Sequence, residues 1–531
     1  MNLLVLAVVC PVLGAVTVAA LPRIFADLRF GVALAASALG ALVTLVVAAK
    51  FAPVSSMQFA FNHELAPNLG VTFSLGVDGI SLGFLVVSAV LCFVSMAVRG
   101  RAVQRATESH VQENLSALLL SQAALAGVYC ADDAVVLWSF WALFAFGCFI
   151  LVGSSGGSRR LLASSKLALS GFATLILLLG VFLYLASQVH DLTGRFSFDL
   201  AGISRVLLPL SSQYVVMLIT LFALALALPL VPLTGWWNDT HAESSAVGST
   251  VLMLGPALYV FVRVLLPCFP LAAMNVMPVV AAAAAIGAFC AAVCCAFEPD
   301  LRKQIAWTAV AQTAIAVAAF ASLTAQGLMG ALLVMASSAL ALSGLFLCVR
   351  THPVEPALQA LAGVERATVL PKLFACSAAL LPGLGGFAAA FAALAGLAAA
   401  DRNHARNGFP EPAFDMEPLW IILCLVGSSV AVGVVLLNSL RGTAGFARTE
   451  RLGLRAWPLW LVLVALVALG LKPQTWVTHT EASINQYMLQ LQGKIRHSSS
   501  YPEAPTHLFP NARSMLFSAT ARPPLQQGQR Q

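Results

Sequence analysis

Charged residues are scarce in this sequence. Asp, Glu, Lys and Arg make up 10% of its 531 residues, against about 25% in soluble globular domains. The 29 Lys and Arg residues form no block of five or more like charges, which argues against a nucleic-acid partner or a polybasic lipid site. The eleven cysteines include no CxxC or CxxCH motif, so iron–sulfur and c-type haem ligation are excluded. We expect no cofactor in this chain.

Apolar residues dominate instead, at 60% of the sequence with a mean hydropathy of +0.89. A helix needs about 17–25 residues to cross a bilayer core. The sequence predicts an all-α polytopic membrane protein in contact with lipids, with a transmembrane domain over 1–472 and a hydrophilic, partly disordered tail over 473–531. Fourteen spans are expected, at about 1–21, 31–52, 78–98, 114–130, 134–154, 162–187, 213–233, 247–267, 274–297, 304–323, 326–349, 369–399, 418–439 and 456–472.

Lys and Arg are distributed unevenly between alternate loops. If the N-terminus faces outside, sixteen of them fall in cytoplasmic loops and five in the opposite loops. Cytoplasmic loops of membrane proteins carry such an excess. We therefore expect an even number of spans, with both termini on the periplasmic side of a bacterial inner membrane.

Two spans contain sequences that interrupt a helix. The seventh runs into Leu228–Pro232, and the twelfth contains Leu381–Gly386, which is rich in proline and glycine. Proline removes a backbone donor, so each helix should break there. Breaks at corresponding places in two halves of a membrane protein indicate inverted repeats around an ion pathway. Because the breaks lie five spans apart, we expect two inverted five-helix repeats; a simple proline kink in each helix is the alternative.

Several short motifs resemble those of the antiporter-like membrane subunits of respiratory complex I (NADH-quinone oxidoreductase), which belong to a family of proton-conducting membrane transporters. The matches follow the family order across about 70–480. They are Gly76–Ser81, Leu228–Pro232 with Trp236, Asp239, His241 and Glu243, Asp300–Thr308, and Leu381–Phe391.

Span number and length are most similar to the M-type subunit. The resemblance implies a place in a membrane arm beside other membrane subunits, with NADH, FMN, Fe–S clusters and quinone held by partner subunits. Relatives also occur in cation/proton antiporters, membrane-bound hydrogenases and inorganic-carbon uptake complexes.

The resemblance also implies a row of ionisable side chains at mid-membrane depth, and most of the expected positions are neutral here. An ionisable group inside a membrane is costly and is kept where ions move. The lost relay positions are Ala142, Ala227, Gly255, Gln312, Ser338 (with Ser337) and Ala390. We expect these small residues to leave a dry, packed midplane.

Three ionisable residues could form a residual ion pathway. Lys166 matches a family lysine, but its side chain could also extend to the interface. His241 and Glu243 follow the first break and could equally be polar caps of a loop. The first hypothesis is a non-catalytic spacer whose proton relay is lost. The alternatives are a proton or sodium translocator with an altered route, and the membrane partner of an inorganic-carbon uptake enzyme.

Four further charged residues adjoin or lie within the spans. Asp78 precedes an apolar run and is expected to cap the third helix. Arg263 is expected to extend to the interface, and Asp132 and Asp133 to end a short exposed turn.

Overall fold

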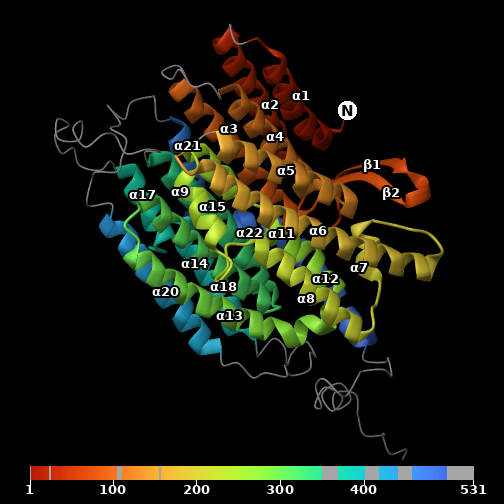
Figure 1. Cartoon of the computed structure of the whole chain (residues 1–531). Coiled ribbons are helices and arrows are strands. Elements are labelled where there is room, and N and C mark those ends of the chain that lie inside the picture. The colour runs from red at the N-terminus through yellow and green to blue at the C-terminus, as the bar shows by residue number, and fades with distance from the viewer. Residues whose placement is uncertain are drawn as a thin grey trace, which may run out of the picture.

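The protein is a bundle of helices with one small β-hairpin at its edge (Figure 1). The computed structural model describes residues 2–22, 25–103, 111–154, 157–349, 369–400, 418–439 and 457–498. The helices of the first half are α1 (Leu3–Ala20), α2 (Ala26–Lys50), α3 (Gly79–Val103), α4 (Val111–Cys130), α5 (Ala134–Ser154), α6 (Arg160–Thr193), α7 (Leu200–Arg205), α8 (Leu210–Ala227) and α9 (Gly235–Glu243). The antiparallel strands β1 (Gln58–Ala66) and β2 (Val71–Val77) are joined by a short 3-10 turn.

The second half contains both long helices and short helical pieces. They are α10 (Ala246–Leu252), α11 (Ala257–Val260), a π-helical turn (Phe261–Leu265), α12 (Leu266–Cys268), α13 (Pro270–Phe297), α14 (Leu301–Ala321), α15 (Ala325–Cys348), α17 (Val369–Ala378), α18 (Gly385–Ala398), α20 (Pro418–Ser439), α21 (Trp457–Leu471) and α22 (Pro473–Ser498).

Every predicted span coincides with a helix or a pair of helical pieces. Among the described residues, eleven helices are long and apolar enough to cross a membrane, or twelve if the bent pair α21–α22 is one span. The more polar α4 and the short pieces α17 and α18 account for the remaining predicted spans. The multi-pass architecture is confirmed, whereas the count of fourteen stays a prediction.

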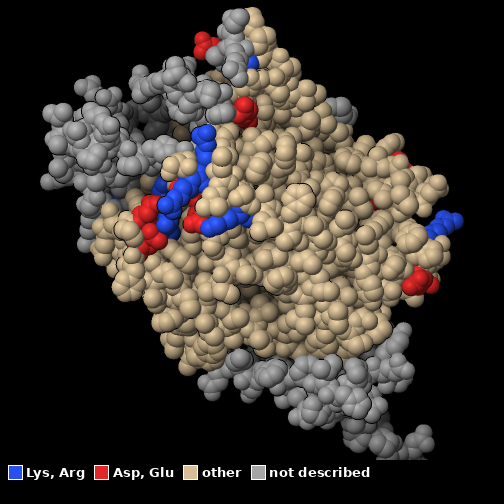
Figure 2. Space-filling view, in the orientation of Figure 1, with Lys and Arg blue, Asp and Glu red and all other residues tan. Residues whose placement is uncertain are grey.

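Buried and exposed helices are arranged as expected for a protein surrounded by lipid. The central helices α3, α14 and α15 are almost wholly buried, whereas α2, α6 and α8 expose many large apolar side chains. Most of the face shown in Figure 2 carries no charged residue. The charged residues that are visible gather at its edges, near α9 on one side and near α7 on the other. Such an apolar band fits the hydrocarbon core of a bilayer.

Both predicted helix breaks are present, and a third was not predicted. The seventh span is interrupted between α8 and α9, and the twelfth between α17 and α18. The eighth span is also broken, between α10 and α11, at Met253–Pro256. Its Gly255–Pro256 pair supplies the same chemistry as the other two breaks, because proline lacks the N–H that would continue the helix.

The N-terminus and the C-terminal helix lie at the same end of the bundle. The Asn2 side chain donates hydrogen bonds to the carbonyls of Phe59 and Ala60 on β1. Gly79, just after β2, donates its N–H to Ser483 of α22 at 2.9 Å. This placement agrees with an even number of crossings between the two ends.

Part of the predicted hydrophilic tail forms the amphipathic helix α22. Ile484, Met488, Leu491 and Ile495 recur at helical spacing and are buried against the bundle. The Tyr487 hydroxyl donates to the carbonyl of Val262 in the π-helical turn. The opposite face of α22 is polar, which is why its low mean hydropathy concealed the helix. Residues 499–531 lie outside the described part of the chain, as do most of the arginines that set the predicted orientation.

Helices α15 and α18 approach each other through glycine. A Cβ atom at Gly330 would lie 2.2 Å from the backbone nitrogen of Ala393, whereas a Cβ at Gly180 on α6 would meet nothing within 4 Å. Overpacking costs about 1–3 kcal/mol. We expect Gly330→Ala to reduce the thermal stability of the subunit by about that amount, with Gly180→Ala neutral as the matched control. Equal melting temperatures of the two variants would contradict the predicted close contact.

Candidate functional site: the broken helices and the cavity between them

The first helix break has one of its freed backbone carbonyls satisfied by a hydroxyl of α6. The last carbonyls of a helix have no partner within it. Ser170 donates its hydroxyl hydrogen to the freed carbonyl of Leu226. Thr174, one turn further along α6, donates at 3.0 Å to the carbonyl of Ala223, which lies inside the last turn of α8. Neutral side chains therefore support the end of α8.

The other two breaks are satisfied in the same way. Gln312 of α14 donates its amide N–H to the carbonyl of Ala378, the last residue of α17, at 2.8 Å. On the far side of that break, Gly386 donates its N–H to the Ser377 hydroxyl at 3.2 Å. At the third break, the Tyr129 hydroxyl donates to the carbonyl of Leu254 at 2.7 Å. Gln312, predicted as a lost relay position, thus holds backbone structure.

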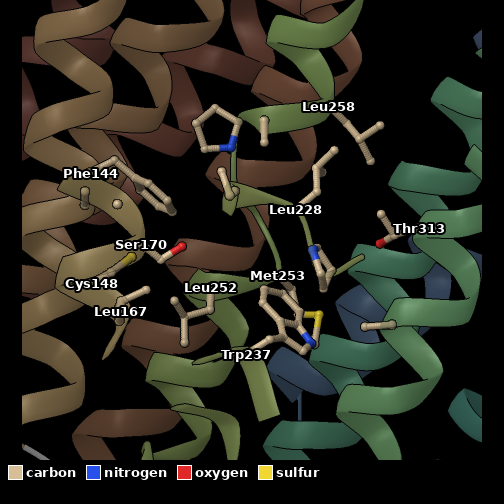
Figure 3. A pocket seen from close by; sticks show the side chains of 18 of the residues that line it. Phe144, Cys148, Leu167, Ser170, Leu228, Trp237, Leu252, Met253, Leu258 and Thr313 are labelled. Carbon is tan, nitrogen blue, oxygen red and sulfur yellow. The ribbon is translucent and has the colours of Figure 1, made fainter. Parts of the chain in front are cut away.

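A cavity of about 90 Å³ lies beside the first and third breaks (Figure 3). Its walls come from α5, α6, both broken spans, α14 and α15. Three of the predicted lost relay positions, Ala227, Gly255 and Ser338, line it. Among the described residues lining the cavity there is no Lys, Arg, His, Asp or Glu.

The remaining relay positions lie elsewhere. Ala142 is half-buried on α5 and packs against the core, and Ala390 is buried on α18. Neither lines the cavity. The expectation of a fully packed midplane was therefore wrong at Ala227 and Gly255. Small side chains there leave space because their neighbours do not collapse completely onto them.

Lys166 points away from the cavity. Its ammonium nitrogen lies 2.5 Å from Asp239 Oδ2 of α9, and the two side chains are 44% and 41% exposed. Leu167 and Ser170 of the same helix line the cavity instead. The side chain of Lys166 is therefore partly exposed and paired with Asp239 outside the cavity lining.

His241 and Glu243 also have separate surroundings. Glu243 accepts a hydrogen bond from the Arg159 N–H at 3.0 Å, where the chain enters α6. The His241 ring is fully buried, 4.9 Å from the Phe346 ring and 4.3 Å from the Trp237 ring. Neither of its ring nitrogens has a hydrogen-bond partner among the described residues. The three predicted pathway residues therefore do not converge on one site, and their role stays a prediction.

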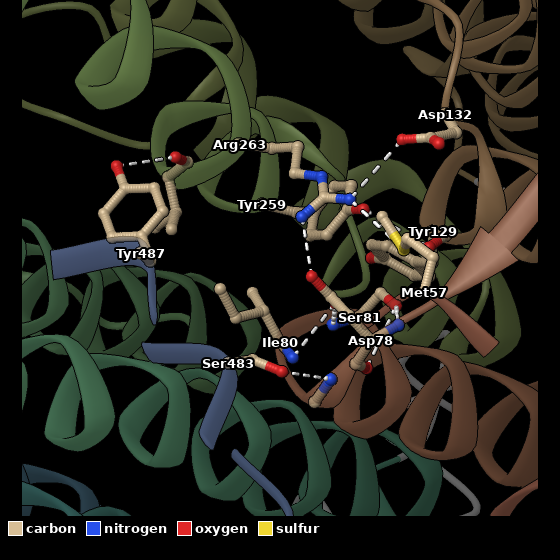
Figure 4. A network of polar contacts seen from close by, with 12 residues as sticks. Met57, Asp78, Ile80, Ser81, Tyr129, Asp132, Tyr259, Arg263, Ser483 and Tyr487 are labelled. Atoms are coloured by element: carbon tan, nitrogen blue, oxygen red, sulfur yellow. Dashed lines mark hydrogen bonds and ion pairs between the residues drawn. The ribbon is translucent and has the colours of Figure 1, made fainter. Parts of the chain in front are cut away.

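A buried ion pair lies at the opposite end of the bundle (Figure 4). Asp78 caps α3 as predicted, because its Oδ1 accepts hydrogen bonds from the N–H groups of Ile80 and Ser81. Its Oδ2 lies 2.6 Å from Arg263 Nη1, and Asp132 is 3.7 Å from the same guanidinium. Arg263, which was expected to extend to the interface, is thus held between two carboxylates that lie just before α3 and just after α4; where the interface lies stays a prediction.

The expectation of an exposed turn at Asp132–Asp133 was wrong for Asp133. Asp133 is fully buried, and it accepts hydrogen bonds from the Val135 N–H at 2.8 Å and from the Thr72 N–H at 3.2 Å. It therefore caps α5 and ties that helix to β2. The sequence did contain a signal for this ion pair. Arg263 is a charged residue inside a predicted span, where a partner of opposite charge is expected, and Asp78 stands at the start of another span.

The described residues contain no group of three or more His, Cys, Asp or Glu placed to hold a metal ion. The cysteines of the chain are free thiols.

Comparison with protein families finds that residues 131–405 match the family described as NADH:quinone oxidoreductase/Mrp antiporter, TM. That match covers more than half of the chain. The chain belongs to this antiporter family. The resemblance predicted from the motifs is thereby confirmed.

Similar proteins include NADH-quinone oxidoreductase subunit M of Rhodobacter capsulatus, 29% identical over 69% of this chain and 74% of that protein. The same subunit of Rickettsia prowazekii is 26% identical over 60% of this chain. The match spans 64% of the Rickettsia protein, slightly under two thirds of its length.

Solved structures share the fold. A chain of respiratory complex I from Thermus thermophilus with bound NADH matches 92% of this chain and 99% of its own length, with a TM-score of 0.76 at 22% identity. A chain of the membrane-bound sulfane sulfur reductase, an archaeal respiratory membrane complex, matches with a TM-score of 0.75 at 16% identity. The predicted fold class, a polytopic antiporter-like bundle, is confirmed.

Removing Arg263 should expose the cost of its buried partner. Arg263→Met leaves the Asp78 carboxylate unpaired, which costs about 3–5 kcal/mol. The double variant Arg263→Met/Asp78→Asn should recover most of that loss, because asparagine still caps α3. The melting temperature of the purified assembly that contains each variant measures the loss in the single variant and the recovery in the double variant. Single and double variants of equal stability would contradict the assigned ion pair.

Asp132 should make stability depend on pH. Burial raises its pKa from 3.8 to about 6, and the nearby Arg263 offsets only part of this shift. The folded chain therefore binds this proton more tightly than the unfolded chain, so stability falls as pH rises from about 4 to about 6. Relative to wild type, Asp132→Asn should lack this decline in melting temperature. The control is Asp191→Asn, at an exposed site on α6, which should show the same fall in melting temperature as wild type. If Asp132→Asn also shows that fall unchanged, the assignment to Asp132 is refuted.

Proposed function

We propose that this chain is a membrane-arm subunit of a complex I-type assembly and acts there as a non-pumping structural module. Family membership, the antiporter-like fold and the similarity to M subunits support the placement. Other membrane-arm subunits would flank it, and NADH, FMN, Fe–S clusters and quinone would belong to partner subunits. The distribution of Lys and Arg among the loops, together with the placement of Asn2 and α22 at the same end of the bundle, supports a bacterial inner membrane with both termini periplasmic.

One observation carries the structural role: the cavity at the broken helices has an uncharged lining. Proton transfer across a membrane needs titratable groups or ordered water joined in a chain. Ala227 and Gly255 cannot hold a proton near neutral pH, and Ser338 offers only a hydroxyl. The polar side chains next to the breaks, Ser170 and Gln312, are already bonded to backbone carbonyls.

Lys166 does not restore the connection. Its ammonium group binds Asp239 at a partly exposed edge of the bundle. An exposed pair of this kind contributes only about 0–1 kcal/mol to stability. It therefore supports the local packing of α6 and α9 without reaching the cavity.

A second candidate is a translocator with an altered route, favoured by the surroundings of His241. Burying an imidazole with both nitrogens unpartnered among the described residues is costly. A bound water that hydrogen-bonds to the ring nitrogens would remove that cost and could also exchange a proton with the imidazole. His241 would then be the first residue of a route independent of Lys166.

Substitution of the two residues separates these candidates. For a structural module, Lys166→Met and His241→Leu should each leave the number of protons pumped per electron unchanged in the assembled complex. The ratio is measured in proteoliposomes, with each variant's content in the complex checked first. A lower ratio in His241→Leu with normal assembly would establish the altered route, and a lower ratio in Lys166→Met would restore lysine to the pathway.

A further inference from the structure

We infer that the cavity beside the two breaks is a binding site for a small uncharged molecule with an apolar body and one hydrogen-bond acceptor. The uncharged lining excludes an ionic ligand, because a buried charge without a partner costs several kcal/mol. Three of the predicted relay positions line this cavity, so the inference rests on the proposed loss of the relay; probe binding and proton pumping are measured separately, and either can fail without the other.

Most of the wall is apolar and rigid. Trp141, Phe144 and Trp237 contribute aromatic surface, and Pro229 and Pro256 stand at the two breaks. Prolines and packed aromatic rings have few rotamers, so the walls cannot readily collapse to close the space. The cavity thus keeps its apolar volume, and a ligand would make dispersion contacts with its walls.

One wall carries unused hydrogen-bond donors. The hydroxyls of Thr313 on α14 and Ser338 on α15 make no hydrogen bond within the described part of the chain. Figure 3 shows the Thr313 oxygen directed towards the interior of the cavity. The indole N–H of Trp236, another lining residue, is buried and also lacks a partner among the described residues. An acceptor oxygen on the ligand would therefore bind at this wall.

The volume limits the size of the ligand. An engineered apolar cavity of roughly 150 Å³ remains dry and binds benzene or xenon. At about 90 Å³, this cavity suits a molecule smaller than a six-membered ring, such as a short-chain alcohol. Each buried water needs about 2–4 polar partners, so the donors of Thr313, Ser338 and Trp236 could hold a single water, whereas a file of waters would lack partners along the apolar remainder of the wall.

The outer wall indicates where the ligand comes from. Ala145 of α5 and Gly171 of α6 line the cavity, are only half-buried, and are small residues. Beside them, Leu169 and Phe172 are 74% and 68% exposed on the apolar flank of α6. A molecule dissolved in the bilayer would therefore reach the cavity between α5 and α6.

Xenon and 2-bromoethanol are suitable probes in crystals of the purified assembly, because both give anomalous scattering. Xenon tests the apolar volume, and the alcohol also tests the donor wall. We expect a peak for each probe in the cavity. Thr313→Val/Ser338→Ala keeps the shape but removes both hydroxyls, so the alcohol should bind about fivefold more weakly, as expected for loss of about 1 kcal/mol, while xenon binding is retained.

Ala227→Leu should fill the cavity and abolish the peaks of both probes. Its control is Gly180→Leu on α6, where the added side chain is unobstructed and both peaks should remain. Failure of Ala227→Leu to assemble leaves the hydroxyl variant as the deciding test. The inference is overturned if ordered waters fill the cavity, if neither probe binds, or if loss of both hydroxyls leaves alcohol binding unchanged.

Discussion

Backbone groups freed by interrupted helices must find partners inside an apolar body, and the architecture of the site depends on this constraint. An unpaired backbone group in such surroundings costs several kcal/mol. At the three breaks, freed carbonyls accept hydrogen bonds from Ser170, Gln312 and Tyr129, at Leu226, Ala378 and Leu254 respectively. These three donors are neutral at physiological pH, so the breaks are supported without a charged residue.

The buried charged residues of the described part of the chain hold structural elements together and lie away from the cavity. Arg263 is paired with Asp78 at one end of the bundle, beside the cap of α3 and close to α22. Asp133 holds α5 against β2. These groups fix how helices, hairpin and C-terminal helix meet, and none of them lines the cavity.

Local chemistry was predictable from the sequence, whereas long-range pairing was not. Pro229, Pro232 and Pro382 act on their own helices, so both breaks and the apolar spans could be predicted from short windows. Arg263 and Asp78 are 185 residues apart in the chain, and their pairing depends on how the spans pack. The cavity could not be predicted either, because whether neighbours close around Ala227 is decided by tertiary packing. The helix α22 was concealed by its polar face.

The neutral relay positions are mutually dependent in energetic terms. Where two buried groups of opposite charge form a pair, removal of one leaves the other without a partner at a cost of about 3–5 kcal/mol. Truncating the next group then relieves that cost, so the loss of one favours the loss of the rest. A lysine in place of Ala227 would stand at the wall of a cavity with an uncharged lining. Because the described breaks are satisfied by neutral donors, the fold itself does not require an ionisable residue at these positions.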